Sequence, residues 1–160
     1  MKVFVIVGSL FPFDRLIKLI DSWAGNNKEV TVTGQIGRSS YRPKNMKYYE
    51  RLSSKDFNSC FSESDLIISH AGMGVILKSL VESKPVVILP RRLDLKEHTT
   101  DHQIATAKAI KRMHYLNVAM TDEELISFLK KPNEIVSKYK IGDNASDNLI
   151  NALKEFIDNN

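Results

Sequence analysis

Three short, largely apolar runs mark the chain, at positions 3–7, 65–69 and 85–90. Successive side chains of a strand point to opposite faces of a sheet, so an unbroken apolar run predicts a strand that is covered on both faces. A further strand is predicted at 30–33 and a short one at 115–119. Buried strands of this kind are typical of parallel sheets.

Between these runs, apolar residues recur at the three- and four-residue spacing of one helix face. Thr121 and Glu124 have the spacing of a capping box, which predicts the start of another helix after the last strand. The predicted helices cover about 16–23, 76–81, 101–113 and 122–129, and an amphipathic C-terminal helix is predicted at about 146–157.

The alternation of strands and helices predicts an α/β fold, with a Rossmann-like, doubly wound, mostly parallel sheet and helices on both sides. The 160 residues suffice for one such domain and not for two ordinary ones. We therefore expect a single domain over 1–160, with its core in about 1–130 and a polar connection at 130–145 before the C-terminal helix.

Composition narrows the class of protein. Apolar residues make up 42% of the chain and charged residues 26%, which excludes disordered, collagen-like and disulfide-rich proteins. The single cysteine, Cys60, has no partner for an internal disulfide. The apolar run at 3–7 is too short for a signal peptide or a membrane span, so we expect a soluble, cytoplasmic chain.

Positive charge is concentrated in one segment. The net charge of the whole chain is +4, whereas residues 38–55 contain six basic residues and one acid, a local net charge of +5. The segment fits a solvated loop with an edge strand, where basic residues discourage pairing with other chains. It fits equally well a docking surface for a protein or an anionic lipid. We expect no nucleic-acid partner, because no nucleic-acid motif accompanies the charge.

Candidate chemistry lies in three loops that follow predicted strands, at 8–12, 70–74 and 90–103. Ligands of an open parallel sheet bind beyond the carboxyl ends of its strands, so the three loops are expected to meet at one edge.

The second of these loops has the features of an anion site. Gly72 and Gly74 precede a predicted helix, whose N-terminus offers unpaired N–H groups and a partial positive charge. The pattern is neither a Walker A loop nor the G-x-G-x-x-G fingerprint of dinucleotide-binding domains. A tight turn without a ligand is an equally good interpretation of this loop taken alone.

The third loop is rich in polar side chains. His98 and His102 have the spacing of a metal-binding pair on one helix face, with Glu97 and Asp101 as further ligands. We favour a polar pocket for a sugar nucleotide over a metal site, since the carboxylates and Gln103 can accept and donate hydrogen bonds to sugar hydroxyls. No metal and no cofactor is therefore expected.

Together, residues 7–17, 69–74 and 97–103 resemble the motifs of glycosyltransferase family 28 C-terminal-domain proteins, in the same order and spacing. The family includes the soluble subunit of the two-part enzyme that adds the second N-acetylglucosamine to dolichol-linked oligosaccharide. It also includes bacterial exopolysaccharide and capsule galactosyl- or glucosyltransferase subunits, which this chain resembles in length.

The resemblance implies half of a GT-B enzyme, equivalent to its C-terminal half. This half binds a UDP-sugar, and a membrane-anchored partner subunit supplies the half that binds a lipid-linked saccharide acceptor. The resemblance implies an inverting transferase that is recruited to the cytoplasmic face of a membrane through this partner. It does not indicate which UDP-sugar is the donor.

The same resemblance implies roles for individual residues. The residues that it implies around the diphosphate are Gly8, Ser9, Gly72, Met73 and Gly74. Those that it implies nearer the ribose or diphosphate are Glu97 and His98, and those near the transferred sugar are Asp101, His102 and Gln103. Val75 departs from the pattern, because many relatives have Ser or Thr there, and this removes one expected hydrogen bond to phosphate.

The departing UDP gains negative charge, which His70 or Arg91 and the N–H groups of the glycine loop are expected to stabilise. The general base is expected in the partner subunit. Two other classes remain as alternatives: a non-catalytic nucleotide-sugar-binding subunit that stabilises a membrane complex, and a sugar-nucleotide epimerase, which needs a second half. A dinucleotide-binding domain is disfavoured, because the acidic residue that follows its glycine motif is missing.

Overall fold

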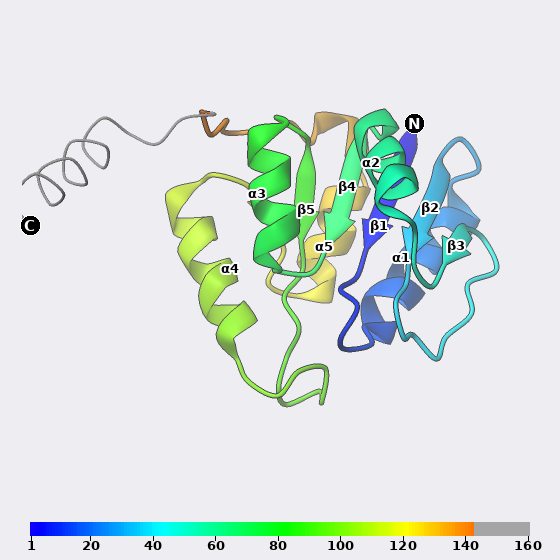
Figure 1. Ribbon diagram of the computed structural model, residues 1–160, viewed down its shortest axis with the longest axis horizontal. Coiled ribbons are helices and arrows are strands. Elements are labelled where there is room, and N and C mark those ends of the chain that lie inside the picture. Colours follow the sequence, from blue (N-terminus) through cyan, green and yellow to red (C-terminus); the bar gives the residue numbers. More distant parts are fainter. Residues whose placement is uncertain (143–160) are drawn as a thin grey trace, which may run out of the picture.

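The computed structural model describes residues 1–142, which form one sheet of six parallel strands with helices on both sides (Figure 1). The strands are β1 (Lys2–Ile6), β2 (Thr31–Gln35), β3 (Lys47–Tyr49), β4 (Leu66–Ser69), β5 (Val86–Ile88) and β6 (Asn117–Val118). Their order is β3-β2-β1-β4-β5-β6, and every neighbouring pair is parallel. The predicted α/β class and parallel sheet are confirmed.

Two apolar cores, one on each face of the sheet, explain the unbroken apolar pattern of the strands. In β1, Val3 and Val5 enter one core and Phe4 and Ile6 enter the other. The helices over the Val5 face are α1 (Asp14–Asn26) and α5 (Asp122–Leu129), and those over the Phe4 face are α2 (Ser54–Glu63), α3 (Met73–Val81) and α4 (His102–Met113).

Local interactions fix the predicted helix ends. The Thr121 hydroxyl accepts a hydrogen bond from Glu124 N at 3.3 Å, which confirms the predicted cap of α5. The Glu124 carboxylate accepts from Met120 N at 2.9 Å, one residue before the position expected for a capping box. Trp23 Nε1 donates to Leu129 O at 3.1 Å and joins α1 to α5 on the same face.

One helix was missing from the sequence interpretation. Helix α2 starts at the Ser53 cap, whose hydroxyl accepts from Asp56 N, and it buries Phe61 against the sheet. The polar connection after α5 contains one 3₁₀ turn (Pro132–Glu134). The predicted C-terminal helix at 146–157 lies outside the described residues.

The order of the strands places a crevice at the centre of the sheet. From β1 the chain continues to β2 and β3 on one side, whereas β4, β5 and β6 lie on the other side. The loops that leave the carboxyl ends of β1 and β4 therefore turn in opposite directions, which is where ligands of doubly wound sheets bind. Strand β3 lies at one edge of the sheet, which agrees with the interpretation of 38–55 as a loop with an edge strand and leaves the docking-surface interpretation open.

Candidate functional site

Three loops meet at the carboxyl edge of the sheet, as predicted. They are the first loop (7–13, after β1), the glycine loop (70–72, after β4) and the polar loop (89–101, after β5). The Arg91 side chain of the polar loop donates to Phe11 O of the first loop at 2.8 Å. The His70 ring of the glycine loop lies against Gly8, where a Cβ would be 3.2 Å from Nε2.

His70 fills the space between two glycines. A Cβ on Gly72 would lie 2.3 Å from His70 Nε2, so this position has room only for glycine. His70 Nδ1 is 3.5 Å from Ile6 O, an atom that can only accept, so Nδ1 donates in this contact and Nε2 keeps its lone pair. Burial, together with the nearby charge of Arg91, lowers the pKa of His70 to about 4. The imidazole is therefore neutral at pH 7.

Helix α3 begins at this point with an uncapped N-terminus. Gly72 occupies the cap position without a side chain to accept from the first N–H groups, and the first turn contains no acidic residue. Gly74 faces open space. A helix of this length presents free N–H groups and a partial positive charge at its start, and both attract an anion. Met73 is exposed and Val75 packs into the core.

A cavity of about 400 Å³ lies in front of the helix start. Apolar side chains, three polar side chains and the backbone of three glycines line it: Ile6, Val7, Gly8, Gln35, Phe57, His70, Gly72, Gly74, Val75 and Lys78. No carboxylate lines this cavity in the part of the chain that the structure describes.

Arg91 is a buried cation without a carboxylate partner. Its side chain donates to Phe11 O and Pro12 O and lies 5.0 Å from the ring centroid of Phe13, and the residue is 2% exposed. Within residues 1–142, no Asp or Glu oxygen lies within 4 Å of its guanidinium. Burial lowers its pKa to about 10. The Nη1 atom lies 3.8 Å from the place of a Cβ on Gly8, next to the cavity.

Gln103 holds the backbone of Arg91. The amide of Gln103 is 3% exposed, and its Oε1 accepts from Arg91 N at 3.1 Å. No hydrogen-bond partner for its Nε2 occurs among residues 1–142. The carboxylate of Asp101 is engaged within the polar loop, where it accepts a hydrogen bond from Leu93 N at 3.1 Å. Of the residues predicted near a sugar, Gln103 therefore retains a free donor.

Glu97 belongs to a different cluster. Its carboxylate accepts two hydrogen bonds from Arg15, at 2.7 and 2.8 Å, and a third from Arg92 N at 3.0 Å. Arg15 also contacts Asp122 at the start of α5. Although burial lowers the pKa of Arg15, the two carboxylates raise it overall. The sequence interpretation missed this network, and Glu97 is engaged away from the 400 Å³ cavity.

The two histidines of the polar loop contact each other and the first loop. The His98 ring lies 4.6 Å from the Phe11 ring and 4.4 Å from the His102 ring, centroid to centroid. His98 Nδ1 accepts from Thr99 N at 2.9 Å, and His102 Nδ1 is 2.7 Å from Thr100 Oγ1. Across residues 1–142, no group of three or more His, Cys, Asp or Glu side chains is arranged to hold a metal ion.

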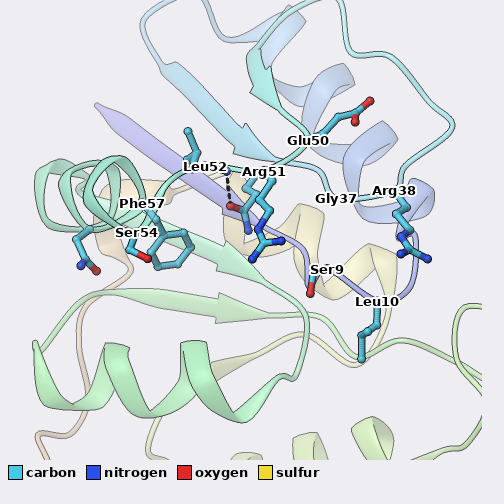
Figure 2. A pocket seen from close by; sticks show the side chains of 11 residues that line it. Ser9, Leu10, Gly37, Arg38, Glu50, Arg51, Leu52, Ser54 and Phe57 are labelled. Carbon is cyan, nitrogen blue, oxygen red and sulfur yellow. Dashed lines mark hydrogen bonds between the residues drawn. The ribbon is translucent and has the colours of Figure 1, made fainter.

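A second, larger cavity of about 760 Å³ opens beside the first loop, over the ends of β2 and β3 (Figure 2). Ser9 lines this cavity rather than the smaller one. Gln35 and Phe57 line both cavities and were not among the predicted site residues. Their only signal in the sequence is position: Gln35 ends β2 and Phe57 lies in the first turns of the missed helix α2.

Comparison with known proteins assigns the family. Residues 2–158 match the glycosyltransferase family 28 C-terminal domain, which is almost the whole chain. The chain belongs to this family. The resemblance read from the three motifs is thereby confirmed, and the fold is that of the C-terminal half of GT-B glycosyltransferases.

The chain is 28% identical over 147 residues to the UDP-N-acetylglucosamine transferase subunit ALG13 of Yarrowia lipolytica. The aligned region covers 81% of this chain and 70% of that protein. An NMR structure of ALG13 matches with a TM-score of 0.58 and 19% identity, over 95% of this chain and 94% of that one. The glycotransferase of kitacinnamycin matches with a TM-score of 0.62 and 16% identity, over 83% of this chain. The match spans only 35% of that glycotransferase.

No helix among residues 1–142 of the family 28 chain is long and apolar enough to cross a membrane.

Proposed function

We propose that this chain is the donor-binding subunit of a UDP-sugar-dependent glycosyltransferase. The observation that carries the proposal is a small cavity lined by His70 and the uncapped start of α3 and, among the described residues, by no carboxylate. The guanidinium of Arg91 lies beside Gly8, one of the residues that line this cavity. A buried guanidinium without a counter-ion is costly unless an anion occupies the site. The similarity to a UDP-N-acetylglucosamine transferase subunit supports a UDP-sugar as that anion.

The cavity suggests an orientation for the donor. The diphosphate would lie against the N–H groups at the start of α3 and near Arg91 Nη1, where charge and donors coincide. The uracil ring would occupy the apolar part that Phe57 and Val75 line. The sugar would then extend toward the polar loop, within reach of the free Nε2 of Gln103.

This arrangement supports catalysis by stabilising the departing UDP. Negative charge grows on the UDP oxygen as the bond to the anomeric carbon breaks, and preorganised donors stabilise it without a metal ion. The acceptor hydroxyl must lose a proton on the opposite face of the sugar. Because no carboxylate lines the donor cavity within the described residues, we assign the general base to an acceptor-binding partner subunit, as in an inverting transferase.

We further propose that the acceptor is a lipid-linked saccharide, and that a membrane-anchored partner brings the chain to the cytoplasmic membrane face. The name of the relative, a transferase subunit, supports a multi-subunit enzyme. The alternative, a nucleotide-sugar-binding subunit without catalytic action, is supported by the same lack of a carboxylate in the donor cavity. Glycosyl transfer is measured in the assembled complex, once with the wild-type chain and once with its Arg91→Met variant, to separate the two.

Ligand-observed NMR of the isolated chain tests the donor. We expect signals of UDP and of one UDP-sugar to show binding, and NAD and ATP to show none. In Gln103→Ala, UDP should bind as before while the preference for one UDP-sugar is lost, because the free Nε2 donor is removed. A thermal melt of the variant controls for the lost bond to Arg91 N. Binding of NAD or ATP alone would refute the proposed function.

The pH dependence of donor binding tests His70. A bound diphosphate favours the charged imidazole and so raises the pKa of His70 from about 4. Affinity for a UDP-sugar, whose diphosphate does not titrate in this range, should therefore increase as the pH falls from 7 toward 5. His70→Gln should show a flat profile. A flat profile in the wild type would mean that the diphosphate does not approach His70.

A further inference from the structure

Helix α3 exposes a continuous apolar stripe. Met73, Leu77 and Val81 follow one another at four-residue spacing, which places them on one face of the helix from its first residue to its last. Their exposed fractions are 53%, 46% and 41%, so the rest of residues 1–142 leaves about half of each residue uncovered. Single exposed apolar residues are ordinary, whereas three in a row along one helix form a surface that favours a partner.

Helix α4 adds positive charge and a further exposed apolar residue to the same side of the molecule. It packs on the same face of the sheet as α3 (Figure 1), and Met113 in its last turn is exposed. The helix contains Lys108, Lys111 and Arg112 but no acidic residue. Lys111 pairs with Glu124, whereas no carboxylate oxygen of residues 1–142 lies within 4 Å of the charged group of Lys108 or Arg112. A partner for this side therefore combines apolar side chains with negative charge.

The described chain ends at one end of the stripe. Ile141 N donates to Leu80 O at 3.2 Å, and the Ile141 side chain packs against the same core as α3. The chain therefore leaves the described part beside the last turn of α3, next to Val81 (Figure 1). The helix predicted from the sequence at 146–157 begins four residues after Gly142, a stretch that spans at most about 14 Å. It can therefore start beside the stripe without crossing the molecule.

The sequence of the C-terminal segment (143–160) fits this surface in polarity, charge and length. Its apolar residues recur at the spacing of one helix face: Leu149, Ile150, Leu153, Phe156 and Ile157. It contains four acidic residues and one lysine, a net charge of −3, which is opposite in sign to the charge of α4. A helix over 146–157 would be about 18 Å long, and α3, with nine residues, is about 14 Å long. One such helix is therefore long enough to cover the stripe from end to end.

We propose that the C-terminal segment folds back as a helix along α3, antiparallel to it, and covers Met73, Leu77 and Val81. It begins beside Val81, where the described chain ends, and its last turn reaches Met73. Gly72 and Gly74, on either side of Met73, line the donor cavity, so the end of the segment lies at the rim of that cavity. The inference does not depend on the proposed function, because the stripe itself does not line the cavity.

Paramagnetic broadening of methionine methyl signals tests the position of the segment. A nitroxide label is attached at Asn151→Cys, on the polar face of the segment, in the full chain with Cys60→Ser so that only one thiol remains. We expect the methyl signal of Met73 to lose most of its intensity and to recover it when the label is reduced. The signal of Met46, which is buried on the other face of the sheet, should keep its intensity.

Two matched variants show whether the apolar stripe holds the segment. Leu77→Gln removes the middle of the stripe, so it should restore most of the Met73 signal in the labelled chain. It should also lower the melting temperature by about 2–4 °C, because a leucine that the segment covers loses its apolar contact. Ile126→Gln replaces a residue of nearly the same exposure, 44%, on α5 at the other face of the sheet. It should leave the Met73 signal as it is and the melting temperature within about 1 °C.

The other outcomes overturn the inference. If Met73 keeps its intensity in the labelled chain, the segment lies elsewhere. If Met73 is broadened equally with and without Leu77→Gln, the segment is near α3 only because the chain ends there. A mixture of labelled chain without isotope enrichment and enriched chain without label detects a second copy. Broadening of Met73 in this mixture would mean that another molecule covers the stripe.

Discussion

Replacing Arg91 with methionine should lower the affinity for UDP about a hundredfold, which corresponds to about 2.7 kcal/mol. Methionine has similar length and no charge, so it fills the same space against the Phe13 ring. The variant loses the guanidinium that lies beside Gly8 with no carboxylate partner in the described part of the chain. In a buried site a charged hydrogen bond to phosphate is poorly replaced by water.

The same substitution should change stability little. It removes the bonds to Phe11 O and Pro12 O, but it also removes a desolvated charge, and these effects oppose each other. We expect the free energy of unfolding to change by no more than about 1 kcal/mol. Titration calorimetry with UDP and a denaturant titration measure the two quantities.

Arg92→Met is the matched control, because Arg92 is the next residue and pairs with Asp94 at the surface. It should bind UDP like the wild type. If Arg91→Met instead binds UDP normally and unfolds more easily, Arg91 only supports the first loop, and the donor site must be sought elsewhere.

The fold followed closely from the sequence because its elements have strong local signals. The run at 3–7 and the proline-bounded strand at 85–90 are buried on both faces, as their unbroken apolar pattern predicts. Helix α2 was missed because its buried face depends on few side chains, chiefly Phe61 with the half-buried Phe57. A stretch with so few apolar positions does not produce a clear helical period.

The site was predictable in outline and not in detail. The strand-to-loop boundaries placed Gly8, His70 and Gly72 together, because the carboxyl ends of parallel strands meet at one edge. The direction of each side chain depends on distant contacts. Arg15 and Glu97 are 82 positions apart, so no local pattern indicates their pairing. For the same reason, Gln35 and Phe57, which line both cavities, were not assigned to the site.

The motif resemblance and the structure give Glu97 different roles. The motif resemblance implies that Glu97 lies near the ribose or diphosphate. In the structure, its carboxylate instead accepts hydrogen bonds from the Arg15 side chain and from Arg92 N. Arg15 and Glu97 have side chains that are only 16% and 10% exposed. Removing one partner of such a pair leaves a poorly solvated charge, which costs far more than the loss of a surface pair.

Glu97→Gln should therefore lower the free energy of unfolding by about 3 kcal/mol, near the lower end for a buried pair because Asp122 still contacts Arg15. The melting temperature should fall by about 6–12 °C. Asp94→Asn, in the same loop, removes an exposed carboxylate and should leave the melting temperature nearly unchanged. Differential scanning calorimetry measures both variants.

UDP binding by the same two variants then decides the role of Glu97. If the pair with Arg15 is its function, Glu97→Gln binds UDP within about twofold of the wild type at a temperature where the variant is folded. The opposite pattern, normal stability with lost UDP affinity, would mean that Glu97 leaves Arg15 and turns to the nucleotide when the donor binds. In that case Arg15 would lose its pair with Glu97 whenever the donor is bound and keep its contact with Asp122 at the start of α5.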